Sequence, residues 1–341
     1  MGRCYVIAEA GSNHNRDWEI AVRLVETAAA AGADAVKFQL FRADRMYPRG
    51  AGTADYLEDP TDIHEIIARM ELPDDWLPGL AAEAGARGLD FLVSGFDEEA
   101  VDAIDPFVPL HKIASYELTH LPLVRHAAAK AKPLLLSTGG GTIEEVEVAI
   151  TAAREAGAAE LVVLQCTASY PARLEALNVG AIVDLRERFD VAVGLSDHSA
   201  DPVIAPVAAT ALGAVAIEKH FTLDRTLPGP DHRFALKPDD LRRMVESIRE
   251  AEAAVGTGRK DVHPDEEPLR VFARRSVFTI RDIRAGEQLD RSAIAVLRSG
   301  KLGPGLAPSE YPRLLGARAA RDLAANTPLA AEDVEAWPSR R

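Results

Sequence analysis

Short apolar runs alternate with longer amphipathic stretches from residue 5 to about residue 255. The short runs are rich in Val, Ile, Leu and Ala and predict eight strands, at residues 6–11, 35–41, 90–95, 110–115, 133–138, 161–167, 191–198 and 214–222. The stretches between them have helical periodicity, among them residues 17–32, 74–88, 143–157 and 201–212. Several of these end in a glycine that relaxes the left-handed C-cap: Gly32, Gly88, Gly157 and Gly213.

Eight strand–helix units in roughly 250 residues indicate the α/β class and a (β/α)8 TIM barrel. We assign this catalytic domain to residues 1–255. The alternative is a doubly wound open sheet. No Gly-rich dinucleotide loop follows the first predicted strand, which favours the barrel.

The C-terminal part of the chain has a different residue pattern from the barrel region. Residues 256–273 begin with a stretch rich in Gly, Pro and charge and are predicted to be a linker. Residues 274–341 predict a small, mostly β domain with strands at 276–280 and 295–298. A domain of this size buries little core, so we expect it to lean on a partner surface.

Composition narrows the possible partners. The formal net charge of −14 argues against nucleic acid or an anionic membrane as a partner. The chain has two cysteines and no targeting or membrane-spanning segment, which indicates a reducing compartment and a cytoplasmic protein.

Chemistry in a TIM barrel lies at the C-terminal ends of the strands, and polar residues gather there in this chain. From the first strand to the eighth, and just beyond them, they include Glu9, Lys37, Gln39, Lys112, Ser115, Ser137, Thr167, Tyr170, Ser196, His198, Glu218 and His220.

Lysine is rare here, with 8 lysines against 31 arginines, yet Lys37, Lys112 and Lys219 fall inside predicted strands. A structural ion pair is the alternative for any one of them. The three together favour an anion site, and phosphate fits because residues 137–141 open a helix whose N–H groups face the same mouth.

His198 and His220 end neighbouring strands at the same height, which favours a divalent transition metal with open positions. Asp231, in a Gly-Pro-Asp-His loop, could add a carboxylate, although this pattern alone also predicts a plain turn. Cys166 has apolar neighbours and no obvious base nearby, so we interpret it as a buried structural cysteine.

In addition, the chain resembles the sialic acid (N-acetylneuraminate) synthases along almost its whole length. The resemblance rests on residues 7–15 (IAEAGSNHN), 32–39 (GADAVKFQ), 112–115 (KIAS), 136–139 (LSTG), 165–167 (QCT) with Tyr170-Pro171, 196–198 (SDH), 218–224 (EKHFTLD) and 229–232 (GPDH). The C-terminal region is similar to the family's antifreeze-like (SAF, β-clip-like) domain.

The resemblance implies a transferase that joins phosphoenolpyruvate to an amino-sugar aldehyde, giving a nonulosonate and phosphate. It implies Mn2+ on His198 and His220, with Mg2+ or Co2+ as alternatives. The implied phosphoenolpyruvate ligands are Lys37, Lys112, Ser115, Ser137 and Ser196. Glu9 and Asp231 would lie beside the reacting sugar and a water, and the implied catalytic residues are Glu9, Lys37, Asp231 and His220. The remaining implied substrate contacts are Gln39, Thr167, Tyr170 and, from the small domain, Arg298.

The chain departs from the family pattern at Arg16, Tyr116, Gly140-Gly141 and Ser299-Gly300. These departures leave open whether the acceptor is N-acetylmannosamine, its 6-phosphate or a 2,4-diacetamido trideoxy sugar. Three further alternatives remain: another deoxy-ulosonate synthase, a class I aldolase with a Schiff-base lysine, and a non-catalytic sugar-binding protein. The linker length and the small second domain also predict a homodimer in which each SAF domain covers its partner's barrel.

Overall fold

Eight parallel strands close into a barrel in the computed structural model, which describes residues 3–53 and 61–335. The outer ends of the two predicted domains, residues 1–2 and 336–341, lie outside the described residues. The strands are β1 (Tyr5–Gly11), β2 (Ala35–Leu40), β3 (Asp90–Gly95), β4 (His111–Ile113), β5 (Leu134–Ser137), β6 (Leu161–Cys166), β7 (Ala192–Asp197) and β8 (Ala216–His220). Because β1 pairs with both β2 and β8, the barrel is confirmed and the open sheet is excluded.

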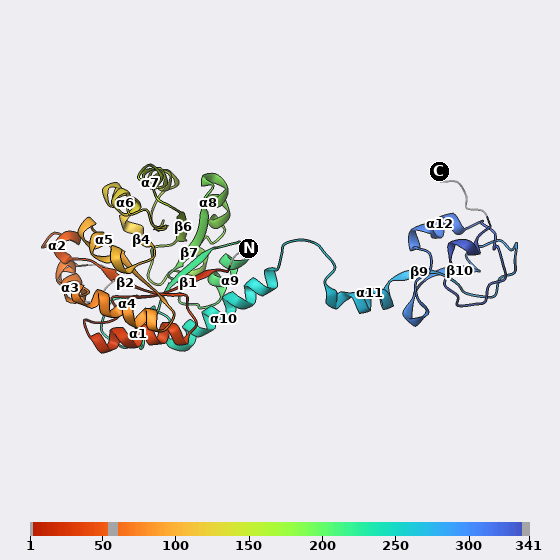
Figure 1. The fold of residues 1–341 in the computed structure, drawn as a ribbon, viewed down its shortest axis with the longest axis horizontal. Coiled ribbons are helices and arrows are strands. Elements are labelled where there is room, and N and C mark those ends of the chain that lie inside the picture. The colour runs from red at the N-terminus through yellow and green to blue at the C-terminus, as the bar shows by residue number, and fades with distance from the viewer. Residues whose placement is uncertain (1–2, 54–60, 336–341) are drawn as a thin grey trace. The chain divides into compact units, whose positions relative to one another are not determined.

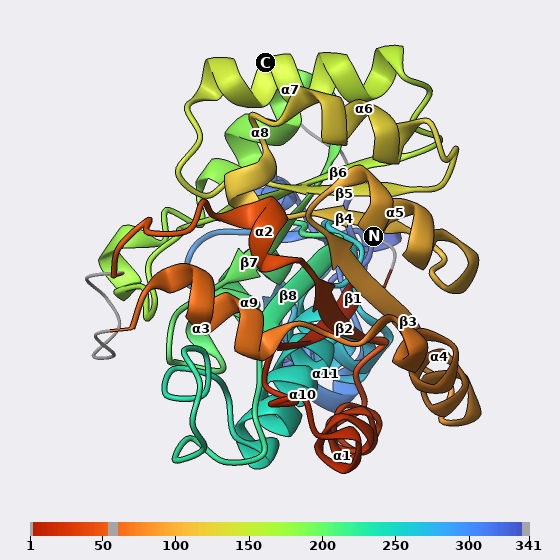
Figure 2. The same cartoon turned by 90° about the vertical axis from the view of Figure 1, so that its left-hand side faces the viewer.

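Helices surround the strands, as Figures 1 and 2 show. The outer ring contains α1 (Trp18–Ala30), α4 (Leu77–Ala86), α5 (Glu98–Ile104), α6 (Leu121–Ala128), α7 (Ile143–Glu155), α8 (Ala181–Phe189), α9 (Ile204–Ala211) and α10 (Pro238–Val255). Two shorter helices, α2 (Ala43–Met46) and α3 (Ile63–Met70), follow β2. Among the described residues, no helix combines the length and apolar character needed to cross a bilayer.

Local sequence explains where these helices begin and end. Asp17 accepts a hydrogen bond from the Ile20 amide at the start of α1, and Thr142 forms a capping box with Glu145 at the start of α7. The four glycines predicted to end helices all have positive φ, between 74° and 94°. These helix stops are therefore confirmed.

The barrel interior has an apolar floor and a polar upper part. A buried apolar cluster fills the floor and consists of Ile7, Ala35, Leu92, Leu135, Val162, Leu164 and Ala216. Side chains alternate across a strand, so the residues two positions later share the inward face. Those on β1, β2, β3 and β8 are Glu9, Lys37, Ser94 and Glu218, and they are buried. The floor thus holds the polar groups toward the C-terminal ends of the strands.

The chain divides into two compact units between Thr257 and Gly258. Within the predicted linker, the segment that starts with Glu267-Pro268 forms helix α11 (Glu267–Ala273), since proline is well tolerated in a first helical turn. The second unit has an antiparallel pair of strands, β9 (Arg275–Thr279) and β10 (Ile294–Arg298), and a short helix α12 (Tyr311–Leu314). It has its own apolar core, which includes Val277, Leu289 and Leu329.

Candidate functional site

Strand register places Glu9 in one row with Lys37 and His220. Glu9 lies opposite Lys37 of β2 and opposite His220 of β8. Its carboxylate accepts a hydrogen bond from Gln39 (2.7 Å) and pairs with the Lys37 ammonium at 2.8 Å. Lys37 also donates to Ser94 of β3 (3.0 Å). Three strands thereby direct polar atoms at one point inside the barrel.

A second lysine and a second carboxylate complete this buried charge cluster. Glu218 of β8 lies 3.6 Å from Lys37 and 3.9 Å from Lys112. Burial opposes ionisation of Glu218, but the two lysines outweigh it and lower the pKa of its carboxyl. Burial raises the pKa of Glu9 to about 7; the nearby Glu218 carboxylate adds to this rise, and Lys37 opposes it without cancelling it. The two carboxyls therefore have different proton affinities within one cluster.

Lys219 takes no part in this cluster, so the prediction that three lysines form one anion site is wrong for it. Its ammonium is hydrogen-bonded to the Asp197 carboxylate (2.6 Å) and the Ser199 carbonyl (2.6 Å). Glu218 and His220 face inward, and the residue between them must point to the opposite side of the strand. Lys219 is a structural ion-pair residue behind the barrel wall.

Three buried serines, Ser115, Ser137 and Ser196, lie at or just after the C-terminal ends of β4, β5 and β7. Ser137 is buried and its hydroxyl has no hydrogen-bond partner, and Ser196 is also buried. The Ser115 hydroxyl accepts a hydrogen bond from the Gly139 amide (3.0 Å). Ser94 is absent from the residues singled out in the sequence, although it is the only polar residue inside its strand after Asp90.

The two histidines predicted to bind metal come together at the barrel mouth. Their ring centroids are 5.5 Å apart. Burial and the neighbouring cations hold the pKa of His220 well below its usual value, so its ring is neutral. Its Nδ1 atom is buried without a hydrogen-bond partner and lies 3.7 Å from the Asp231 carboxylate. A neutral imidazole with an unpartnered nitrogen fits a divalent metal ligand.

The candidate protein ligands for such a metal are the imidazoles of His198 and His220. Within residues 3–53 and 61–335, no group of three or more His, Cys, Asp or Glu side chains is arranged to hold a metal ion. A metal held by these two histidines would keep its remaining coordination positions open to water or substrate.

His198 is oriented from behind by the end of β6. Its Nδ1 donates to the Thr167 carbonyl (3.0 Å) and lies 3.7 Å from the Cys166 sulfur. This leaves Nε2 as the atom that can bind a cation. Cys166 is buried as predicted, but the expectation that it has no base nearby is wrong, because the neighbouring strand β7 brings His198, 32 positions later, beside it. The Thr167 hydroxyl donates to the Ala176 carbonyl, so its predicted contact with substrate stays a prediction.

Carboxylate and amide groups line the other side of the mouth around Gly11. A β-carbon added to Gly11 would lie 3.4 Å from Asp231 and 3.5 Å from both Gln39 and Glu9. Gly11 follows an irregularity in the β1–β2 register and has φ of 54°. Burial raises the pKa of Asp231 to about 6. Polar groups of three different segments thus gather around Gly11, and one of them, Asp231, lies 3.7 Å from His220.

Aromatic rings form the rim near the histidines. The Tyr170 ring centroid lies 4.3 Å from that of His198 and 5.3 Å from that of Phe234. Phe234 also packs against His220, at 5.3 Å, and was not identified from the sequence. Its only signal is a position three residues after Asp231.

The Asn-His-Asn motif after β1 supports the loops rather than facing the charge cluster. Asn13 donates to the Phe221 carbonyl (2.8 Å), and His14 accepts from the Arg16 amide (3.0 Å). Asn15 is hydrogen-bonded to His232 (3.2 Å). The motif thus ties the first loop to the last one.

Arg298 lies in the second unit, at the end of β10, opposite Arg275 of β9. The outer end of this strand is exposed to solvent. An exposed arginine that is directly opposite another cation is available for an anionic or carbonyl partner.

Two family models match the chain. The model described as the NeuB family matches residues 24–260, and the SAF domain model matches residues 274–335.

The chain is 38% identical to the N,N'-diacetyllegionaminic acid synthase of Legionella pneumophila, over 98% of this chain and 95% of the relative. It is 34% identical to the pseudaminic acid synthase of Helicobacter pylori, over 97% of each chain. A solved structure of N-acetylneuraminic acid (sialic acid) synthetase from Leptospira borgpetersenii has a TM-score of 0.72 at 27% identity, covering 79% of this chain and 90% of that one.

Proposed function

The chain belongs to the NeuB family and carries a SAF domain, and from this premise we propose that it is a phosphoenolpyruvate-dependent nonulosonate synthase. The acceptor is an N-acyl amino-sugar aldehyde similar to N-acetylmannosamine, and the products are a sialic-acid-type nonulosonate and phosphate. The observation that carries the proposal is the convergence of two buried lysines, Glu9 and two histidines inside one barrel mouth.

Phosphoenolpyruvate is the anion that we assign to the lysines. Lys37 and Lys112 supply positive charge inside the barrel. Hydroxyls of Ser115, Ser137 and Ser196 add donors, and the unpartnered Ser137 hydroxyl supports this assignment. Fixed charges and donors in a site without bulk water stabilise developing charge far more than solvent does.

The reaction joins carbon 3 of phosphoenolpyruvate to the aldehyde carbon, water adds to carbon 2, and the tetrahedral product loses phosphate. Glu9 accepts the proton of that water, a role that its pKa of about 7 suits near neutral pH. A divalent metal held by His198 and His220, which we expect to be Mn2+ with Mg2+ or Co2+ as alternatives, would polarise the aldehyde.

We place the sugar beside the two histidines and the aromatic rim formed by Tyr170 and Phe234. Asp231 and Gln39 orient its hydroxyl groups, and Tyr170 packs against one face. We assign Thr167 to the same pocket through its backbone and Arg298 to the acyl group of the sugar. Legionaminic and pseudaminic acid synthases among the relatives make a 2,4-diacetamido trideoxy acceptor the alternative to N-acetylmannosamine.

We further propose a homodimer in which the SAF domain of one chain covers the barrel of its partner. A lid of this kind would exclude water during condensation. We place the reaction in the cytoplasm, as the sparse use of cysteine predicts.

A phosphate-release assay tests the proposal. The full-length protein with phosphoenolpyruvate and Mn2+ should release phosphate only with an accepted sugar, drawn from N-acetylmannosamine, its 6-phosphate and 2,4-diacetamido trideoxy sugars. EDTA should abolish the release and Mn2+ should restore it, while His198→Ala and His220→Ala should fold but remain inactive.

Borohydride trapping separates this chemistry from the class I aldolase alternative. A covalent adduct with pyruvate, together with full activity in EDTA, would establish the Schiff-base enzyme instead. Another deoxy-ulosonate synthase would be indicated by phosphate release with a sugar aldehyde that lacks an acylamino group.

A further inference from the structure

The thiol of Cys166 lies between the two halves of the proposed site. Cys166 ends β6 and is 6% exposed. Its sulfur accepts a hydrogen bond from the Ser115 hydroxyl at 3.3 Å and lies 3.7 Å from Nδ1 of His198. Ser115 belongs to the anion half and His198 to the metal half, so one sulfur atom contacts a member of each.

The donor and acceptor of each hydrogen bond around Cys166 can be assigned. The Gly139 amide donates to Ser115, and the Ser115 hydroxyl donates onward to Cys166. A carbonyl oxygen can only accept, so the bond from His198 to Thr167 places the proton of a neutral ring on Nδ1. The sulfur therefore lies beside two donors, and in the neutral ring Nε2 of His198 keeps its lone pair.

The packing around this sulfur is tight. A β-carbon on Gly139 would lie 2.8 Å from the Ser115 hydroxyl and 2.9 Å from the Cys166 sulfur. A side chain at position 139 would therefore displace the serine or the cysteine. The chain of contacts depends on the absence of that side chain.

Sulfur suits this position for two reasons. It is a weak acceptor, so the Ser115 proton can turn to an incoming anion at little cost. The longer C–S bond also allows one atom to reach both Ser115 and His198. An oxygen at the same position would accept the Ser115 hydrogen bond more strongly, and its shorter bond to carbon would weaken its contact with His198 without removing it.

We propose that Cys166 is a positioning residue, which fixes the His198 ring for cation binding and accepts the Ser115 hydrogen bond until the anionic substrate replaces the sulfur as acceptor. This inference rests on the proposed function, because that function assigns the metal to His198 and phosphoenolpyruvate to Ser115.

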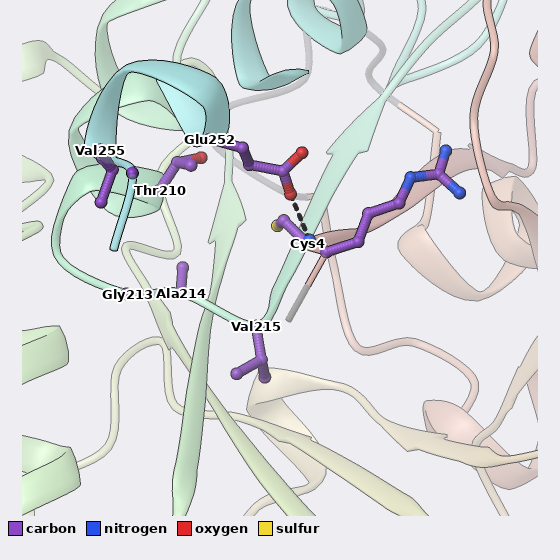
Figure 3. Close-up of a pocket in the computed structure, with 9 residues that line it drawn as sticks. Cys4, Thr210, Gly213, Ala214, Val215, Glu252 and Val255 are labelled. Atoms are coloured by element: carbon purple, nitrogen blue, oxygen red, sulfur yellow. Dashed lines mark hydrogen bonds between the residues drawn. The ribbon is translucent and has the colours of Figure 1, made fainter. Parts of the chain in front are cut away.

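The other cysteine offers a matched control. Cys4 is also buried, and its amide donates to Glu252 at the wall of a cavity of about 270 Å3 (Figure 3). It precedes β1, at the end of the barrel opposite the site. Burial raises the pKa of its thiol to about 12. Cys4→Ala thus removes a buried thiol without touching the site.

The test measures binding by calorimetry on the full-length protein, without turnover. Dissociation constants for Mn2+ alone and for phosphoenolpyruvate alone are compared in wild type, Cys166→Ala, Cys166→Ser and Cys4→Ala. For Mn2+, Cys166→Ala should bind roughly 10-fold more weakly than wild type, and Cys166→Ser less so because it keeps an acceptor. For phosphoenolpyruvate, Cys166→Ser should be the weaker variant, by roughly five-fold, because its oxygen accepts the Ser115 hydrogen bond more strongly.

This crossed order is what a packing defect cannot produce, since packing would rank the two variants alike in both measurements. The same order in both, or Cys166 variants that match Cys4→Ala, would overturn the inference alone. A wild-type protein that binds neither Mn2+ nor phosphoenolpyruvate would overturn the proposed function and the inference with it.

Discussion

Glu9 is held between a buried environment that opposes its charge and two groups that favour it. Burial raises its pKa to about 7, while Lys37 and the Gln39 amide stabilise the carboxylate. A carboxyl group is ionised above its pKa and protonated below it, and only the ionised form can accept a proton from water. If Glu9 is the base of the proposed reaction, the titration of this one side chain should set the lower pH limit of activity.

We predict that kcat/KM for phosphoenolpyruvate falls as the pH falls through about 7, at saturating Mn2+. Gln39→Met removes a donor to the ionised carboxylate (2.7 Å), so the pKa of Glu9 should rise and the acidic limb should move to higher pH. Initial rates of phosphate release between pH 5 and 9 measure both effects. A limb that moves to lower pH in Gln39→Met would show that Glu9 does not control it.

Gly11 is the second residue whose contribution to the site can be tested by a single substitution. Gly11→Ala introduces a methyl group among Asp231, Gln39 and Glu9 at a φ of 54°. Gly157→Ala introduces the same kind of backbone strain at a φ of 94°, with nothing within 4 Å. Both variants should lose roughly 1–2 kcal/mol of unfolding free energy, measured by urea denaturation. Only Gly11→Ala should lose activity, by about 100-fold. Equal activities in the two variants would mean that the space beside Gly11 is not part of the site.

At the scale of single elements, the two-residue period of the strands decides which side chains can act. On β8, Glu218 and His220 face the barrel interior while Lys219 pairs with Asp197 behind it. The same sequence neighbours therefore have separate tasks, chemistry on one face and stability on the other.

Lys219→Ala is expected to destabilise the fold by about 3–5 kcal/mol, because it leaves Asp197 buried without a counter-ion. Lys37→Ala should instead abolish phosphoenolpyruvate binding, since Lys37 is turned into the site. Thermal unfolding and calorimetric titration separate the two effects. Lys130→Ala, which removes an exposed Lys–Asp pair, serves as the control and should barely change the melting temperature. A Lys219→Ala protein with wild-type stability would contradict this assignment.

The strands and helices were largely predictable from the sequence, because short stretches of neighbouring residues determine where a strand lies and where a helix ends. All eight predicted strands exist, and Gly32 and Gly157 end helices as expected. The prediction for Lys219 was wrong because it considered only the charge of the side chain. Successive side chains of a strand face opposite sides, so Lys219 cannot share the inward face with Glu218 and His220. The contact between Cys166 and His198 could not be read locally, since it joins residues 32 positions apart on neighbouring strands.

Ser94 and Phe234 were missed for a related reason. A serine in an apolar strand and a phenylalanine in a loop carry no chemical signal until register and loop packing place them beside Lys37 and His220. The sequence therefore predicts which charged residues point into the barrel better than it predicts which neighbours pack against them.

At the scale of the whole molecule, the proposal requires two chains for each complete site. If Arg298 serves the partner's barrel, Arg298→Ala and His220→Ala chains that are inactive alone should regain about a quarter of wild-type activity when refolded together. That value follows when half of the dimers are mixed and each mixed dimer has one native site. Mixed dimers are verified by two affinity tags. Inactive mixed dimers would mean that Arg298 serves its own barrel or none.

In the proposed reaction, water attacks carbon 2 of phosphoenolpyruvate, so that the C–O bond breaks. Phosphoenolpyruvate labelled with 18O at the bridging oxygen, an accepted amino sugar and the Mn2+-loaded protein test it in one reaction, read by mass spectrometry of the products. The account predicts that the released phosphate keeps the label. A label found in the nonulosonate, with unlabelled phosphate, would show attack at phosphorus and would contradict the proposed mechanism.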